Sequence, residues 1–377
     1  MTSSIPLGRI LGIRIGIHWS WLVVFALIAW TLASGIFPST NPGLSHASYV
    51  WMAIVASILF FASLLLHELG HAVQARREGM EIDGITLWLF GGVARFKGMF
   101  PSAGAEFRIA IAGPLVSLAL GLLFALGAWA ISTRESIDGV AAWLGYINLT
   151  LLVFNMLPAL PLDGGRVLRS ILWHVRGSFR WATRVAASIG RGFAFLFIGA
   201  GLFLFIFQGS FSGAWLAFVG WFLFQAATAE DRYLLVHDAL GDLRVADVMI
   251  RDPVTLRPHV SIGRFMDQVA WSRRYTTYPV VEDGRPLGLL AFRCVAAVPR
   301  AEWDTRLVGE CMIPRDRVPV LRPTQSAVDA LATLSDGDVH RGFVLDGDRL
   351  VGFLSITDLT RALEVRAADR ERLPRAA

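Results

Sequence analysis

An uncharged apolar run, residues 53–66, leads directly into the short ionisable cluster His67-Glu68-Leu69-Gly70-His71. Residues four apart on an α-helix lie on one face, so His67 and His71 can ligate the same metal ion. Glu68 stands beside them and has the chemistry of a base that activates water. Ionisable groups at membrane depth are costly and usually functional. The pattern predicts a metal site at the end of a membrane span, the alternative being a polar helix end at the membrane surface.

Composition places the chain among membrane proteins. It is 54% hydrophobic and only 17% charged over 377 residues, which is too apolar for a soluble protein of ordinary composition. The net charge of +5 is spread over loops and does not indicate binding to nucleic acid. The two cysteines, Cys294 and Cys311, are too few for a disulfide framework. Six apolar segments are long enough to span a membrane, at roughly residues 19–37, 50–74, 107–131, 140–157, 193–207 and 214–228.

The distribution of basic residues predicts the orientation of these spans. Loops with several Lys or Arg alternate with loops that have few or, as at 38–49 and 208–213, none. Cytoplasmic loops carry the excess of basic residues. We therefore expect a multi-pass protein of the inner (cell) membrane with its N- and C-termini in the cytoplasm. The first span also resembles a cleavable signal peptide, but the bulky pair His18-Trp19 favours a retained anchor.

A catalytic zinc site needs a third protein ligand, and the end of the fourth span offers one. Asp163 is the only acidic residue near that membrane end. Pro158 and Pro161 break the helix and free its backbone, which is tolerated at membrane depth where it lines a polar cavity. Gly164 and Gly165 are expected to allow a tight turn behind the carboxylate. The alternative interpretation is an ordinary interfacial loop of turn residues.

Two further polar residues lie in the same segment. Asn155 can point into the cavity and donate a hydrogen bond to a developing oxyanion, or it can serve in helix capping or packing. Arg166 is expected to anchor the chain at the cytoplasmic surface rather than to take part in catalysis.

The two motifs together resemble those of the site-2 proteases, intramembrane zinc metalloproteases that cleave transmembrane segments. The resemblance extends over about residues 10–228. It implies that His67, His71 and Asp163 bind one zinc ion (Zn2+) per chain. It also implies that Glu68 is the catalytic base and that Asn155 assists the oxyanion or positions the substrate.

The third span carries a weaker part of the same resemblance. Gly113-Pro114 fits the family pattern, which often continues with an Asn, whereas Leu115-Val116-Ser117 follows here. An active-site role for this span is therefore in doubt, and close helix packing is the expected use of Gly113.

A small sheet is predicted near the cytoplasmic face of the spans. Two β-prone runs flank Gly91-Gly92, which is a hairpin signal, and residues 13–17 alternate as a strand does. The exposed edge of such a sheet can take up an unwound substrate strand, whose peptide bonds are more accessible to water than those of a helix. The alternative role is structural cover for the site.

From about residue 243 the composition changes and the chain repeats itself, with similar units that open near Val245 and Val308. The repeat resembles a tandem pair of cystathionine-β-synthase-type (CBS) domains, a soluble α/β module that often binds adenine nucleotides. The predicted organisation is a transmembrane zinc metalloprotease domain at 1–230, a linker at 231–243, CBS domains at 244–300 and 301–366, and a tail at 367–377.

Only the second repeat keeps the ribose-binding pattern of the CBS family. It has Ser355 and Asp358, where the first repeat has Ala291 and Cys294. The resemblance therefore implies at most one well-formed site for ATP or another adenine nucleotide. The alternative is a structural module or one that forms a homodimer, with Ser355 or Asp358 as a helix cap.

The sequence thus predicts a polytopic α-helical membrane protein with about six transmembrane helices, a small membrane-associated β-sheet and a soluble α/β tandem CBS module. The expected function is intramembrane zinc endopeptidase activity in regulated intramembrane proteolysis, with nucleotide-responsive regulation as a hypothesis. Its expected partners are a transmembrane protein substrate and the lipid bilayer. The alternatives are a CBS-regulated channel or transporter, which would repeat polar residues across several spans, and a catalytically idle homologue that only binds membrane partners.

Overall fold

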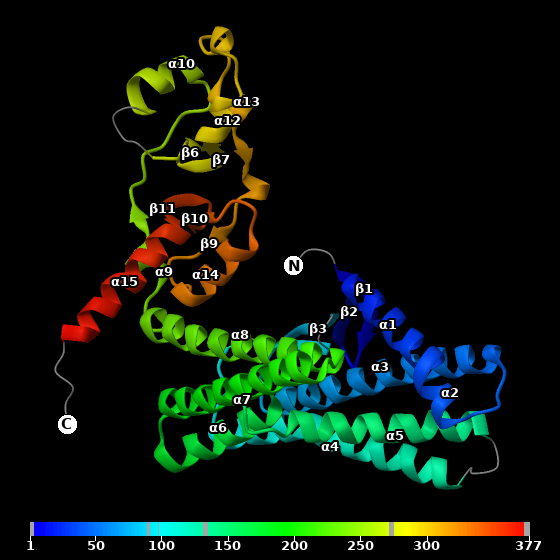
Figure 1. Cartoon of the computed structure of the whole chain (residues 1–377). Coiled ribbons are helices and arrows are strands. Elements are labelled where there is room, and N and C mark those ends of the chain that lie inside the picture. The colour runs from blue at the N-terminus through cyan, green and yellow to red at the C-terminus, as the bar shows by residue number, and fades with distance from the viewer. Residues whose placement is uncertain (1–3, 89–90, 97, 131–134, 271–274, 373–377) are drawn as a thin grey trace. The chain divides into compact units, whose positions relative to one another are not determined.

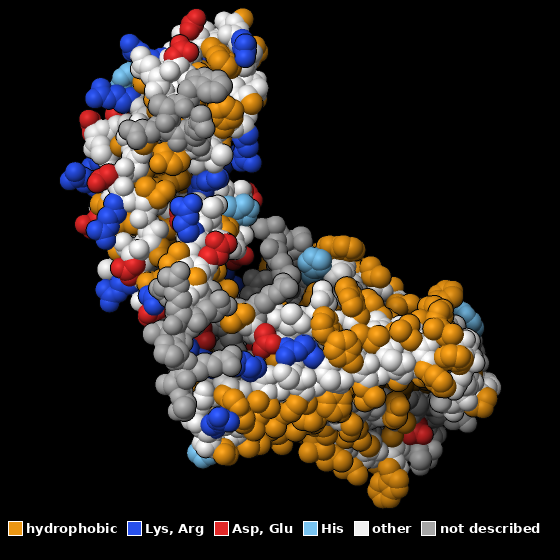
Figure 2. All heavy atoms as spheres, turned by 60° about the vertical axis from the view of Figure 1, so that its left-hand side comes forward, with side chains coloured by type: hydrophobic (Ala, Val, Ile, Leu, Met, Phe, Trp, Pro, Cys, Tyr) orange, Lys and Arg blue, Asp and Glu red, His pale blue; other side chains and the backbone are white. Residues whose placement is uncertain are grey.

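The computed structural model describes residues 4–88, 91–96, 98–130, 135–270 and 275–372. The chain divides into two compact units, Met1–Arg232 and Tyr233–Ala377 (Figure 1). Figure 2 shows the first unit densely covered by hydrophobic side chains, whereas charged side chains are interspersed over the second. An apolar exterior suits contact with lipid, and a charged one suits contact with water.

Among the described residues, six helical segments are long and apolar enough to cross a membrane, which confirms the prediction of about six spans. The first is a continuous run of α1 (Ser20–Thr31), a π-helical turn (Leu32–Ile36) and α2 (Phe37–Thr40). The shorter helix α6 (Asp163–Arg176) lies between the fourth and fifth spans. The remaining spans are α3 (His46–Arg77), α4 (Ala103–Ala130), α5 (Glu135–Asn155), α7 (Phe179–Gln208) and α8 (Phe211–Leu240).

The last two spans are longer than the apolar segments that predicted them. Helix α7 begins at Phe179 and is capped by Ser178, whose Oγ accepts a hydrogen bond from Trp181 N at 3.3 Å. Helix α8 continues through most of the segment expected as a linker and ends at Leu240. Hydropathy detects only the part of a helix that lies in lipid, because the polar turns at its ends extend into the aqueous layer.

Small residues bring neighbouring spans close together. A Cβ added at Gly121 of α4 would lie 2.8 Å from Leu149 Cδ2 of α5. A Cβ added at Gly201 of α7 would lie 2.4 Å from the backbone nitrogen of Ala217 in α8. Such close backbone approach is a main source of helix association in membranes, where apolar burial alone gives little driving force.

Four strands form a small sheet in the order β1 (Ser4–Ile10), β2 (Ile13–His18), β3 (Ile82–Trp88) and β4 (Gly91–Phe96). β1 and β2 pair antiparallel, as do β3 and β4, and β2 runs parallel to β3. This confirms the predicted hairpin, although Gly91 and Gly92 begin β4 rather than form its turn, and residues 89–90 lie outside the described residues. β1 and β4 are the edge strands.

The sheet is fixed to the helix that carries the ionisable cluster. Ile13, Ile15 and Ile85 are buried against Leu69 and Ala72 of α3. With 3.6 residues per turn, Leu69 and Ala72 lie on the side of α3 away from His67 and His71, so one face of the helix packs on the sheet while the other carries the histidines.

The second unit contains the predicted repeat. β6 (Thr277–Glu282) and β7 (Arg285–Ala291) form one hairpin, and β10 (Arg341–Asp346) and β11 (Arg349–Ser355) form the other. Both hairpins have a register shift at the equivalent place, after Val280 and after Val344. The short strands β5 (Ile250–Arg251), β8 (Ile313–Pro314) and β9 (Val320–Leu321) complete the two sheets. The described α-helices that follow α8 are α9 (Val245–Val248), α10 (Ile262–Phe265), α12 (Phe292–Ala296), α13 (Val308–Cys311), α14 (Ala327–Asp336) and α15 (Ile356–Arg372).

Candidate metal centre

Helix α3 presents two histidines one turn apart. Ser45 caps its first turn, since its Oγ accepts a hydrogen bond from Ser48 N at 3.2 Å. The uncharged middle of the helix satisfies its own backbone hydrogen bonds, as a span in lipid must. His67 and His71 follow this apolar stretch and are both 4% exposed.

Asp163 approaches the histidines from a distant part of the chain. Helix α5 ends at Asn155, and Pro158 and Pro161 prevent it from continuing, as expected. Helix α6 then begins at Asp163 itself, which is 8% exposed. A carboxylate in the first turn of a helix is favoured by the helix dipole.

Gly164 and Gly165 do not form the tight turn that was expected behind this carboxylate. Both lie in the first turn of α6. A Cβ added at Gly164 would lie 2.3 Å from the carbonyl oxygen of Met156, and one added at Gly165 would lie 2.3 Å from the nitrogen of Leu160. The two glycines are therefore required because the preceding loop packs directly on the start of the helix that carries Asp163.

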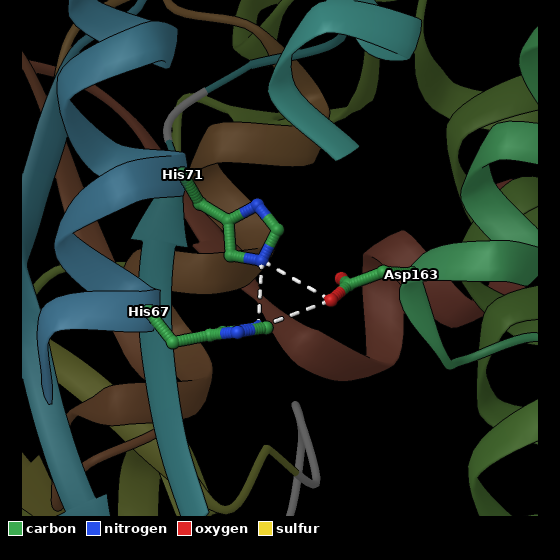
Figure 3. Close-up of side chains that lie close together, drawn as sticks. All are labelled: His67, His71 and Asp163. Carbon is green, nitrogen blue, oxygen red and sulfur yellow. Dashed lines mark hydrogen bonds and ion pairs between the residues drawn. The ribbon is translucent and has the colours of Figure 1, made fainter. Parts of the chain in front are cut away.

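The structure brings His67, His71 and Asp163 together in one buried group (Figure 3). Asp163 Oδ2 lies 3.1 Å from His67 Nε2 and 3.3 Å from His71 Nε2, and the two Nε2 atoms are 3.2 Å apart. Around a tetrahedral zinc ion with ligands at about 2.0–2.1 Å, two ligand atoms are separated by about 3.3 Å. Two imidazoles and a carboxylate with these separations fit a zinc ion and leave a fourth position open.

Helix α4 orients both imidazole rings. His71 Nδ1 lies 2.7 Å from the carbonyl oxygen of Ile109, which can only accept a hydrogen bond, so Nδ1 carries the proton and a neutral ring leaves a lone pair on Nε2. His67 Nδ1 lies 2.8 Å from Ser117 Oγ. Partners of this kind fix the direction of metal-binding histidine rings, and the Ile109 carbonyl also fixes the tautomer of His71.

Gly113 of α4 faces the same group. A Cβ added there would lie 2.2 Å from His71 Nε2 and 2.7 Å from His67 Nε2. Close packing was the expected use of Gly113, and the structure shows that its packing partners are the two histidines. No sequence motif predicts that Ser117 and the Ile109 carbonyl contact the Nδ1 atoms of the two histidines. The only sequence signal is that Ser117 stands one turn beyond Gly113 on the same helix.

Glu68 borders strand β4. A Cβ added at Gly92 would lie 2.3 Å from Glu68 Cγ and 3.2 Å from Glu68 Oε1. Glu68 follows His67 directly in α3, and its carboxylate lies near His71, Asp163 and Arg166 as well. Glu68 is therefore near both the ligand group and an edge strand of the sheet.

Asn155 and Arg166 take different positions. Asn155 is the last residue of α5 and is partly buried, and no hydrogen bond between described residues joins it to His67, His71 or Asp163. Arg166 stands three residues after Asp163 on α6, and its Nε is buried with no hydrogen-bond partner among the described residues.

In the second unit, Ser355 and Asp358 bond to each other. Asp358 Oδ2 accepts from the nitrogen of Ser355 at 3.0 Å and from its Oγ at 2.6 Å, and Ser355 Oγ accepts from Asp358 N at 3.3 Å. This reciprocal arrangement caps the start of α15. Asp358 also lines a pocket of about 450 Å³ together with Arg361. In the first repeat, Ala291 provides no side-chain cap for α12.

Known protein families match both the membrane-spanning part of the chain and its C-terminal repeat. The model of peptidase family M50 matches residues 55–133 and 130–199, and the CBS domain model matches residues 245–297 and 308–365. The chain is 38% identical over 372 residues to a Mycobacterium tuberculosis protein named as zinc metalloprotease Rip3, covering 97% of this chain and 94% of that relative. It is 31% identical over 365 residues to a zinc metalloprotease of Methanocaldococcus jannaschii, covering 97% of both chains.

A solved structure of a site-2 protease from Methanocaldococcus jannaschii is 31% identical, covers 60% of this chain and 95% of that chain, and has a TM-score of 0.42. The two M50 segments contain the cluster His67–His71 and Asp163, respectively. The long identity to the curated relatives extends through the CBS pair as well. The chain therefore belongs to peptidase family M50, the site-2 protease family of membrane zinc metalloproteases, and carries a C-terminal pair of CBS domains.

Proposed function

We propose that this protein is an intramembrane endopeptidase that hydrolyses a peptide bond in a transmembrane segment of another membrane protein. The observation that carries this proposal is the buried group of His67, His71 and Asp163 directly after the uncharged apolar run of α3, with Glu68 beside it. A site built at membrane depth favours substrates that are themselves in the membrane. Two relatives are named as zinc metalloproteases, and these names support a protease over a channel or transporter.

In this proposal the two histidines and Asp163 hold one zinc ion. When bound, zinc supplies the Lewis acid that polarises the scissile carbonyl and acidifies water. The Glu68 carboxylate takes a proton from the attacking water and passes it to the nitrogen of the departing amine. The rings stay aligned because Ile109 and Ser117 hold their Nδ1 atoms. We further propose that Asn155, at the end of α5, donates a hydrogen bond to the carbonyl oxygen of the substrate.

We propose that the substrate binds as an extended strand along β4. An edge strand has unpaired backbone groups that can take up another strand. Of the two edge strands of the sheet, β4 is the one that contacts Glu68, through Gly92. A segment unwound onto β4 would therefore place its peptide bonds near the proposed base.

The proposed base is tested by Glu68→Gln in the full-length chain. The variant keeps the size of the side chain and the three ligands but cannot accept the proton. We expect one zinc per chain, as in the wild type, and a cleavage rate lower by about 10²–10⁴-fold. Zinc is measured by elemental analysis, and cleavage by following a transmembrane substrate reconstituted with the enzyme in liposomes.

Glu302→Gln is the matched control, because Glu302 is an exposed residue of the second unit and should leave both quantities unchanged. Turnover that persists in Glu68→Gln contradicts the role of Glu68. Absence of zinc from the wild type contradicts the metal site.

We propose that the protein lies in the inner membrane with both termini in the cytoplasm, because loops rich in basic residues alternate with loops that have few or none. Single cysteines introduced at Ser45 and Arg251, in a chain without Cys294 and Cys311, test this orientation with an impermeant thiol reagent on intact cells. We expect labelling at Ser45 only, and labelling at Arg251 alone would reverse the topology.

We propose, finally, that one adenine nucleotide binds per CBS pair at Ser355 and Asp358 and changes the rate of cleavage. The pocket lined by Asp358 and Arg361 supports this site, as does the absence of a comparable acidic cap in the first repeat. A nucleotide regulates the enzyme only if its affinity differs between two states of the protease, since equal affinity shifts no equilibrium.

A further inference from the structure

Arg169 of α6 is buried at a point where three other elements meet. Its Nε and Nη2 lie 2.7 Å and 2.5 Å from Glu106 Oε1 of α4, and its Nη1 lies 3.3 Å from Glu230 Oε2 of α8. Its guanidinium carbon also lies 5.0 Å from the ring centroid of Phe179 and 5.8 Å from that of Phe100. The N–H groups of the guanidinium thus contact carboxylates while its flat face contacts aromatic rings, and a lysine could not reproduce this combination.

This ion pair is a poor choice if stability is its only purpose. The side chains of Arg169 and Glu106 are 4% and 0% exposed, and Glu106 Oε2 has no hydrogen-bond partner among the described residues. Desolvating two charges offsets much of their attraction, and replacing a buried ion pair by apolar residues of similar volume is often neutral or stabilising. A fixed geometry between helices is what such a pair supplies in return.

Of the two helices that the pair joins, α6 carries Asp163 and α4 orients the two histidines of α3. Glu106 stands one turn before Ile109, whose carbonyl oxygen accepts from His71 Nδ1. Arg169 stands six residues after Asp163, about 9 Å along the axis of α6. His67 and Asp163 are 96 residues apart in the chain, so their spacing depends on how α6 sits against α3 and α4.

We propose that Arg169 is a positioning residue for the metal centre. Its ion pair with Glu106 holds α6 in register with α4, and this keeps Asp163 Oδ2 at ligand distance from both histidine Nε2 atoms. Glu230 holds the third guanidinium nitrogen and so prevents the fork from turning away from Glu106. The inference rests on the zinc site of the proposed function, but it concerns metal affinity and geometry rather than proteolysis.

The test replaces the pair by apolar residues, Glu106→Leu with Arg169→Leu, in the purified full-length chain. This double variant leaves no unpaired charge between α4 and α6, so the helices can still pack. We expect zinc affinity, measured by competition with a chromophoric chelator, to fall about 10–100-fold. With Co²⁺ in place of zinc, the visible absorption should change in intensity and position, because the Asp163 ligand is displaced. The single variant Arg169→Lys should bind zinc more weakly than the wild type but more tightly than the double variant. A lysine keeps the charge, but its ammonium group cannot hold Glu106 Oε1 and Glu230 Oε2 in one fixed plane.

The matched control is Arg191→Leu with Asp231→Leu, which removes an ion pair between α7 and α8 without touching α6. Zinc affinity and the Co²⁺ spectrum of this control should equal those of the wild type. Equal losses in the two double variants would show a general loosening of the fold and overturn the proposal, as would an unchanged affinity and spectrum in the first.

Two further outcomes separate this proposal from the proposed function. If the Glu106/Arg169 double variant does not fold, the proposal is tested with Glu106→Gln instead, because this change keeps the shape of the side chain and removes only its charge. Its zinc affinity must then fall relative to the wild type, and an unchanged value overturns the proposal. If the wild type and these variants bind zinc equally well, only the role of Arg169 is refuted. If the wild type binds no zinc, the metal site itself is refuted.

Discussion

The arrangement of the His67 and His71 rings depends on a neighbouring helix as well as on their spacing in the sequence. The i, i+4 relation only places them on one face of α3. Their Nε2 atoms point towards Asp163 because the Nδ1 atoms are held by Ser117 Oγ and the Ile109 carbonyl of α4. For His71 the Ile109 carbonyl also fixes the lone pair on Nε2, although α4 supplies none of the three ligand atoms.

Gly113 provides the sharpest test of this arrangement at the residue scale. In Gly113→Ala the new methyl group would lie 2.2 Å from His71 Nε2, so the ring must move off the metal position while every ligand remains in the chain. We expect zinc affinity to fall by about tenfold or more, as for other changes that misdirect ligands. The measurement is zinc content per chain after dialysis against a buffered free-zinc series.

Gly127→Ala on the same helix is the control, since a Cβ there meets nothing within 4 Å. It should bind zinc like the wild type. Equal zinc affinity in Gly113→Ala and the wild type would show that the imidazole rings do not need the space that Gly113 leaves open.

At the element scale, the helix pair α7 and α8 depends on close backbone contact. A Cβ at Gly201 would lie 2.4 Å from Ala217 N and 2.6 Å from the carbonyl oxygen of Gly213. Gly201→Ala should therefore push the helices apart and lower the free energy of unfolding by about 1–3 kcal/mol, as overpacking does in other cores. Unfolding in mixed micelles with increasing denaturing detergent, followed by circular dichroism, measures the change.

Gly199→Ala is the comparison for this variant, because a Cβ at Gly199 meets no atom within 4 Å and alanine favours the helix. It should be as stable as the wild type or slightly more so. Equal stability of Gly199→Ala and Gly201→Ala would mean that the two helices separate without cost.

At the scale of the whole molecule, the sequence predicted what depends on periodic or repeated patterns. The six spans, the β3–β4 hairpin and the repeat that contains the hairpins β6–β7 and β10–β11 all follow from such patterns. The helix ends did not, because the polar turns of α7 and α8 have no hydropathy signal. The contact of Gly92 with Glu68 and the ion pair of Arg169 with Glu106 were also out of reach, since each joins residues far apart in the chain.

The proposed asymmetry of the CBS pair gives a prediction for the whole chain. Asp358→Ala removes the carboxylate that lines the pocket of the second repeat, whereas Cys294→Ala changes the corresponding position of the first. We expect Asp358→Ala to weaken binding of ATP, ADP or AMP about tenfold or more, the value of one hydrogen bond to a charged group, and Cys294→Ala to leave it unchanged. Calorimetry on the purified full-length protein measures the affinities.

Asp358→Ala also removes a helix cap, because Asp358 Oδ2 accepts from Ser355 N at 3.0 Å. Ser326→Ala separates the two effects, since Ser326 caps α14 of the same unit by accepting from Val328 N at 3.2 Å and does not line the pocket. Both variants should lose comparable stability, about 0.5–2 kcal/mol, but only Asp358→Ala should lose nucleotide. Equal affinity in Asp358→Ala and the wild type would place the nucleotide elsewhere. If the wild type shows no binding of any adenine nucleotide, the CBS pair has a structural or dimerising role, and the cleavage rate should then be the same with and without nucleotide.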